Sequence, residues 1–251
     1  MPINYLRRLT SPARSESSNR QLGRSLAFVA GAVNAGGFLA VGQYTSHMSG
    51  VVSAMADDLV LGQTMLLATG VGSLLAFMVG AAGSAVMINW ARRRRLHSEY
   101  AMPLMLEAML LLCFGILGSN LDGHRLLFAP VTVMLLCFVM GLQNAMISKI
   151  SRSEIRTTHV TGLVTDIGIE LGRMCYWKMA PRTPGELNGD DPLPPARRRF
   201  ALLSSLLLMF FLGGVAGALG FKAVGFLATV PLAASLFVLA LVPLMDDLSR
   251  H

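Results

Sequence analysis

Residues 44–50 read YTSHMSG and residues 156–162 read RTTHVTG, and this repeated motif decides how the chain is organised. Both copies place two hydroxyl residues before a histidine, and a further hydroxyl residue and a glycine after it. Upstream, GAVNA at residues 31–35 matches GLQNA at residues 141–145. Short matches that recur in the same order predict an internal repeat.

Long apolar stretches flank both motifs. Hydrophobic residues make up 53% of the 251 residues and charged residues only 14%, whereas soluble domains carry about 25% charged residues. A bilayer core about 30 Å thick needs roughly 20 apolar residues per helix. We therefore expect an all-α membrane protein with about six transmembrane helices, at residues 25–42, 64–90, 101–118, 126–147, 201–220 and 224–245.

The six expected helices divide into two repeats of three, at residues 25–118 and 126–245. Further matches link the second span to the fifth and the third to the sixth: Phe77, Gly80 and Gly83 against Phe211, Gly214 and Gly217, and Pro103-Leu104 against Pro231-Leu232. Because three is an odd number, the second copy must enter the membrane from the opposite face. The copies are therefore expected to be inverted, as in many transporters that work by alternating access.

Basic residues predict the orientation. All of the 21 Lys and Arg except Arg125 and Lys222 fall in the two termini or in the loops after the second and fourth spans. Positive charge marks the cytoplasmic side, so both termini are expected there. The net charge of +7 then reflects topology, and we expect no nucleic-acid partner. Residues 1–24 are expected to form a flexible cytoplasmic tail, and residues 181–199 a solvated linker.

A family resemblance follows from these motifs. The stretch MGLQNAMISKISRSEIRTTHVTGLVTDIGIELGR at residues 140–173, with GAVNAGGF at residues 31–38 and the motif around His47, resembles the YoaK/DUF1275 family of bacterial membrane proteins. Many members carry an acidic residue where this chain has Asn34. The resemblance implies a multi-pass protein of the bacterial inner membrane. It implies no substrate, because the family is named for unknown function.

The second motif suggests either a binding site or a helix cap. Thr161 precedes an apolar-periodic run, which predicts the N-cap of an amphipathic cytoplasmic helix over residues 162–178, with Asp166 on its polar side. Thr158, His159 and Thr161 thus place hydroxyls and an imidazole at a helix N-terminus, where free N–H groups favour an anion. The alternative is that they only cap the helix where it leaves the membrane.

The first motif offers Ser46, His47 and Ser49 in the matching arrangement. Asp57 and Asp58 follow it and are weak candidates for a metal site, since adjacent side chains diverge on a helix. Each histidine can titrate in the physiological range, which suits proton coupling. A structural hydrogen bond is the alternative for either one.

Three of the polar residues inside the expected spans are candidates for a functional role. Glu107 is the one carboxylate there, and intramembrane acids are functional candidates because they are costly. The alternative is a hydrogen-bonded acid, or one that reaches the interface. Asn34 and Asn144 lie at matching depths of the first and fourth spans, where they can line a cavity or join the helices by a hydrogen bond.

Together these features favour a small secondary transporter or channel for an unknown small solute or ion. The site would lie between the first and fourth spans, with Glu107 as a proton carrier. Six spans are few for a transporter, so a homodimer is plausible. We expect no cofactor, because a nucleotide loop would need a strand–turn–helix context. The alternatives are a non-transporting scaffold or sensor, and a membrane enzyme that pairs a histidine with Asp57 or Asp166.

Overall fold

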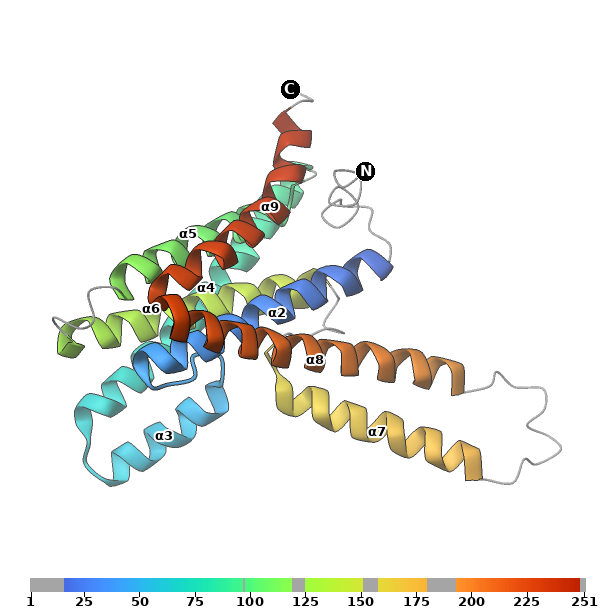
Figure 1. Ribbon diagram of the computed structural model, residues 1–251, viewed down its shortest axis with the longest axis horizontal. Helices are drawn as coiled ribbons and strands as arrows, with labels where there is room; N and C mark the ends of the chain where they lie inside the picture. The colour runs from blue at the N-terminus through green and yellow to red at the C-terminus, as the bar shows by residue number, and fades with distance from the viewer. Residues whose placement is uncertain (1–15, 97, 119–124, 151–157, 180–192, 249–251) are drawn as a thin grey trace.

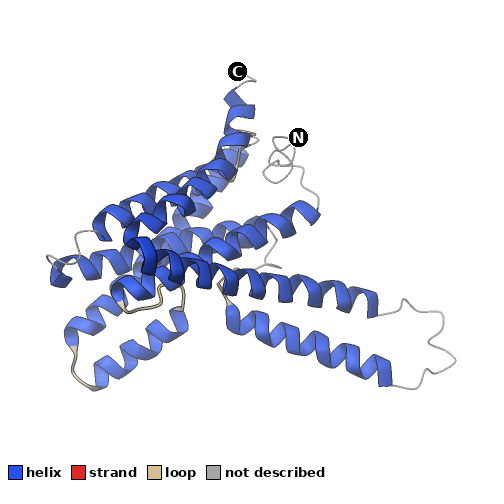
Figure 2. Ribbon diagram, viewed as in Figure 1, coloured by secondary structure: helices blue, strands red, loops and turns tan. Residues whose placement is uncertain are grey.

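The computed structural model describes residues 16–96, 98–118, 125–150, 158–179 and 193–248 (Figure 1). Within these residues there is no strand, and Figure 2 shows helices joined by short loops. Leu, Ala and Met, which favour helices, are frequent in this part of the chain. The α-helices are α2 (Glu16–Val41), α3 (Met48–Val60), α4 (Thr64–Arg93), α5 (Ala101–Gly118), α6 (Arg125–Ile150), α7 (Val160–Met179), α8 (Leu193–Val224) and α9 (Thr229–Leu248). The 3₁₀ helix η2 (Gly225–Ala228) separates α8 from α9.

Five stretches of the described residues are long and apolar enough to cross a membrane: Asn19–Leu39, Thr64–Arg93, Ala101–Gly118, Ala129–Ile150 and Pro195–Leu241. The last stretch contains α8, η2 and most of α9, so it includes both of the last two spans expected from the sequence. Many large apolar side chains of these helices are exposed, as suits a surface covered by lipid. The chain is therefore a multi-pass helical membrane protein.

Helices α2 and α8 run parallel and touch through their backbones. Arg24 Nε donates to Ser205 Oγ at 2.8 Å near one end of the contact, and the Phe221 ring covers Gly36 near the other. Between them, a Cβ added to Gly31 would overlap the carbonyl oxygen of Phe210. Small residues permit this approach, which is typical of helix packing in membranes.

Helices α4 and α6 make a matching pair. They also run parallel, and a Cβ on Gly141 would overlap the carbonyl oxygen of Phe77, as one on Gly80 would overlap that of Phe138. The burial patterns of the two pairs coincide as well. Residues 19–37 and 129–147 have the same order of buried, partly buried and exposed positions, and so do residues 72–82 and 205–215.

This matching corrects one sequence alignment. The sequence paired Phe77 with Phe211, but the backbone contacts put Phe210 in the place equivalent to Phe77, because Phe77 covers Gly141 as Phe210 covers Gly31. Adjacent phenylalanines, followed by adjacent glycines at 213 and 214, make both registers look acceptable in the sequence. Only the close helix contact distinguishes them.

The centre of the molecule lies where these pairs meet α5 and α9. Gln143 Nε2 of α6 donates to the carbonyl of Leu26 in α2 at 3.3 Å, so α2 and α6 are joined directly. Helix α5 packs on α6 and α9, and Phe114 meets Phe226 edge to face with ring centroids 5.6 Å apart. The fully buried side chains Leu26, Leu104 and Leu136 belong to this core.

The first helix begins earlier than the sequence suggested. Residues 16–24 were expected to belong to a flexible tail, but α2 starts at Glu16. Leu22 is fully buried and Arg24 is bonded to Ser205. Packing against α8 therefore extends the helix into a segment whose composition is polar. Residues 1–15, and 181–192 of the expected linker, lie outside the described residues.

Candidate functional site

Hydrogen bonds join the turn before α3 to α2. Ser46 Oγ donates to Asn34 Oδ1 at 2.8 Å, and the Ser46 backbone N–H reaches the same oxygen at 3.4 Å. Asn34 lies seven residues before the end of α2 at Val41, which corresponds to about 10 Å along a helix. After α2 ends at Val41, the chain therefore reverses direction and returns about 10 Å along α2 before α3 begins.

A hydrogen bond joins the turn before α7 to α6 in the same way. Asn144 Nδ2 donates to Thr158 Oγ1 at 2.5 Å, and Asn144 lies six residues before the end of α6 at Ile150. In Figure 1, α3 and α7 both begin near the middle of the molecule and diverge, α3 toward the lower left and α7 toward the lower right. Asn34 and Asn144 thus join helices by hydrogen bonds, but each partner is a helix start rather than the other asparagine.

Each motif histidine immediately precedes its helix. The Val51 N–H donates to the His47 carbonyl at 3.1 Å, and the Leu163 N–H donates to the His159 carbonyl at 3.0 Å. Helix α7 thus starts at Val160, two residues before the expected start, and the carbonyl of His159 rather than that of Thr161 accepts its first hydrogen bond. His47 and His159 are both exposed.

The glycine of each motif makes room for the imidazole. A Cβ on Gly50 would overlap the ring of His47, and a Cβ on Gly162 would overlap the ring of His159. Each ring therefore lies over the first turn of its own helix. His47 Nε2 is also 3.5 Å from Ser49 Oγ. The same spacing of His and Gly in the two motifs thus reflects the same local geometry, which forms once in each motif.

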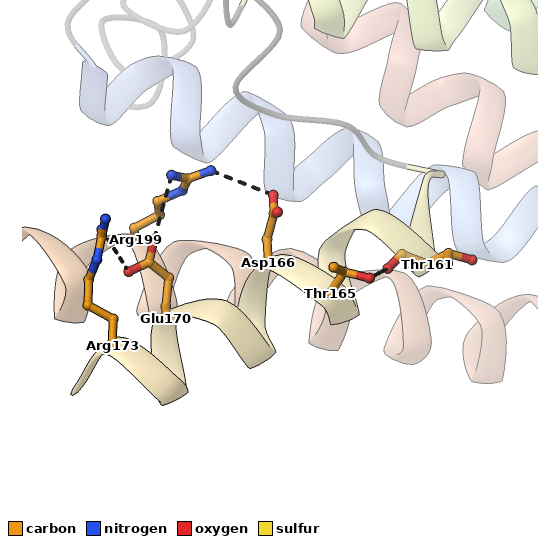
Figure 3. A network of polar contacts seen from close by, with 6 residues as sticks. All are labelled: Thr161, Thr165, Asp166, Glu170, Arg173 and Arg199. Atoms are coloured by element: carbon orange, nitrogen blue, oxygen red, sulfur yellow. Dashed lines mark hydrogen bonds and ion pairs between the residues drawn. The ribbon is translucent and has the colours of Figure 1, made fainter. Parts of the chain in front are cut away.

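Helix α7 turns its acidic side toward α8. Arg199 of α8 reaches Asp166 Oδ2 at 3.6 Å and Glu170 Oε1 at 3.5 Å, and Arg173 reaches Glu170 Oε2 at 3.5 Å (Figure 3). Glu170 is only 2% exposed, whereas the apolar Val164 is 51% exposed. The amphipathic pattern was expected, but here polar groups face protein and apolar groups face outward, as suits surroundings of lipid.

Replacing Arg199 with leucine is expected to lower the free energy of unfolding by about 1–2 kcal/mol, because Glu170 would stay buried with only Arg173 beside it. A value below the usual cost of breaking a buried pair is appropriate, since Arg199 itself is 59% exposed. Thermal unfolding in detergent would measure the change. Arg198→Leu is the matched control, because Arg198 is exposed on the same helix. Equal stability of the two variants would contradict a structural role for these ion pairs.

A cavity of about 310 Å³ lies between α3, α4 and the loop before α3. Its lining comprises Gln43, Tyr44, His47, Gly50, Val51, Ala54, Met55, Asp58, Leu66, Thr69, Gly70 and Ser73. Of the residues proposed from the sequence as a binding or metal site, His47 and Asp58 are brought together here. Thr69, Gly70 and Ser73 also line the cavity but were not predicted from the sequence, where their signal is a set of small residues at helical spacing in an apolar helix.

The other candidates lie elsewhere. Glu107 is fully buried in α5, and neither of its carboxylate oxygens has a hydrogen-bond partner among the described residues. Asp57 is exposed. No group of three metal-ligating side chains occurs in the part of the chain that the structure describes. Asp166, one of the carboxylates considered as a partner of a histidine in an enzyme, faces Arg199.

These features define a class of protein: a multi-pass helical membrane protein in which two helices, α3 and α7, start at asparagine-bonded, histidine-containing turns. The family model for DUF1275, described as a protein of unknown function, matches residues 22–242, and the chain belongs to that family. Comparison with curated proteins and with solved structures gave no match.

Proposed function

We propose that the protein transports a small solute or ion across the membrane, and that its two halves are inverted repeats of three spans each. The matching contacts of α2 with α8 and of α6 with α4 support the repeat. Helices α8 and α9 then cross separately, which gives six spans. Basic loops favour cytoplasmic termini in a bacterial inner membrane.

One observation carries the proposal: in each half a helix starts beside an asparagine that lies six or seven residues before the end of the preceding long helix. Helix α3 has 13 residues and is about 20 Å long, which is too short for a hydrocarbon core of about 30 Å. It starts beside Asn34, inside the depth that α2 covers, and α7 starts beside Asn144 in the same way. Non-helical backbone at membrane depth is tolerated where it is buried in protein or lines a cavity.

Discontinuous helices hold substrate in secondary transporters, where their N-terminal ends present free N–H groups near the midplane. In this chain the two ends belong to different halves and lead away to opposite faces. Movement of one half against the other would expose the start of α3 to one side and the start of α7 to the other. The close glycine contacts between the halves provide the surfaces for such a movement.

A cysteine at the start of α3 or of α7 is expected to react with a charged, membrane-impermeant thiol reagent. Ser49 and Thr161 occupy the same exposed position in the first turn of α3 and of α7. In a chain from which Cys113, Cys137 and Cys175 have been removed, Ser49→Cys should be labelled from outside in right-side-out vesicles. Thr161→Cys should be labelled from the cytoplasmic side in inside-out vesicles. Water must reach both positions if they belong to a solute pathway.

Ser235→Cys is the matched control, because Ser235 is exposed on the apolar helix α9, where lipid is expected. It should not react from either side. If Ser49→Cys and Thr161→Cys are as unreactive as this control, both helix starts are sealed in lipid or protein. A non-transporting scaffold would then be the better description.

A further inference from the structure

The small residues of α4 that line the cavity beside His47 have large counterparts in the second half. In the matched register, the positions of Thr69, Gly70 and Ser73 in α4 correspond to leucines in α8, namely Leu202, Leu203 and Leu206. Those three leucines are buried at 9%, 2% and 0% exposure. The second half therefore fills with side chains the space that the first half leaves open.

The charges of the two halves differ at the same place. Asp58 of α3 corresponds to Glu170 of α7, since each lies eight residues after the glycine of its motif, Gly50 or Gly162. Glu170 is paired with Arg173 and Arg199. The residues that correspond to these arginines in the first half are Leu61 and Leu66.

At these two positions the first half therefore supplies no cation to the Asp58 carboxylate. Asp58 is partly buried in the cavity lining, and no ion pair to it occurs among the described residues. An uncompensated carboxylate in apolar surroundings is costly unless something neutralises it. In the second half a guanidinium group from α8 does so, and in the first half the cavity leaves room for one from outside.

The hydroxyl groups of the cavity lining also favour a ligand that donates hydrogen bonds. Thr69 Oγ1 donates its hydrogen to the carbonyl of Met65 at 3.0 Å, and Ser73 Oγ donates to the carbonyl of Thr69 at 2.8 Å. Only their lone pairs remain for a ligand, so they accept hydrogen bonds as Asp58 does. Apolar atoms of Val51, Met55 and Leu66 make up much of the remaining wall.

We propose that this cavity binds a small organic cation, an ammonium or guanidinium group on a short apolar stem, with the charged group on Asp58. Thr69 and Ser73 accept further hydrogen bonds from its N–H groups, and the stem lies against Met55 and Leu66. A volume of about 310 Å³ is at the small end of ligand pockets. The inference rests on the proposed function for its biological meaning, since the bound cation would be the transported solute.

Binding to detergent-purified, full-length protein tests the inference without requiring transport. The probes are butylguanidinium and butylammonium, with butyrate and butanol as the anionic and neutral counterparts of the same stem. Isothermal titration should show saturable binding of the two cations and none of butyrate. Asp58→Asn should weaken butylguanidinium binding at least about tenfold, whereas the exposed neighbour Asp57→Asn should leave it unchanged. Ser73→Leu, which copies Leu206, should also weaken it by filling the space.

Three results would overturn the inference. They are equal binding of butyrate or butanol by the wild-type protein, no binding of either cation, and cation binding that Asp58→Asn leaves intact. The comparison of probes on the wild-type protein decides the matter even if a variant fails to fold. Failure of the proposed function is distinguishable, because cations would then bind in the first half while Thr161→Cys, at the start of α7 and outside the cavity lining, stays unlabelled from the cytoplasmic side.

Discussion

Gly80→Ala is expected to destabilise the protein by about 3 kcal/mol, the upper end of the usual cost of overpacking. The added methyl group would overlap the carbonyl oxygen and carbon of Phe138. Backbone atoms of a neighbouring helix cannot rotate away as the end of a flexible side chain can. Helices α4 and α6 would have to separate along their contact, and packing at such glycine contacts is what holds membrane helices together.

Thermal unfolding in detergent would measure the effect, and the chain offers two matched comparisons. Gly83→Ala places the same methyl group one turn along the same helix, where nothing lies within 4 Å. It should leave stability unchanged or slightly raised, because alanine favours helix more than glycine does. Gly213→Ala should resemble Gly80→Ala, because its methyl group would overlap the carbonyl of Phe28. Equal melting of the Gly80 and Gly83 variants would show that α4 and α6 do not approach as described.

The long helices could be predicted from the sequence because the bilayer requirement is one of length and composition alone. The helix α3 was not expected as a separate element, since its 13 residues are too few for a span and do not follow the pattern of a soluble amphipathic helix. Its place is set by the bond between Ser46 and Asn34, which is a tertiary contact. The earlier start of α2 at Glu16 also depends on a partner, since Arg24 is bonded to Ser205.

The candidate site could likewise be predicted from the sequence only in part. The repeated motif identified His47 and His159, and the structure gives both the same place at the start of a helix. The cavity beside His47 could not be inferred from the motif, because it depends on Gly70 and its neighbours in α4, far along the chain. Its charge could be interpreted only once the register had matched Asp58 with Glu170.

Glu107→Leu is expected to raise the free energy of unfolding by about 2 kcal/mol, because a buried polar group without a partner costs about 1–3 kcal/mol. Glu107 is fully buried, and neither carboxylate oxygen is hydrogen-bonded within the described residues. Leucine has a similar volume and suits the surrounding side chains, which include Leu104 and Leu111. Thermal unfolding in detergent would measure the gain.

Two further variants test whether the unpartnered carboxyl group is the cause of this gain in stability. Glu107→Gln keeps the shape and the unpartnered oxygen, so it should gain much less than Glu107→Leu. Glu99→Leu should instead lose stability, because Glu99 accepts from Arg92 Nε at 2.7 Å.

A loss of stability in Glu107→Leu would mean that the carboxyl group serves packing. A gain would mean that the chain keeps an acid inside the membrane at the expense of stability, which is characteristic of a residue that acts on a solute or a proton. In that case Glu107→Leu should bind butylguanidinium as the wild type does, since Glu107 is not in the cavity lining, but fail to carry it across proteoliposomes.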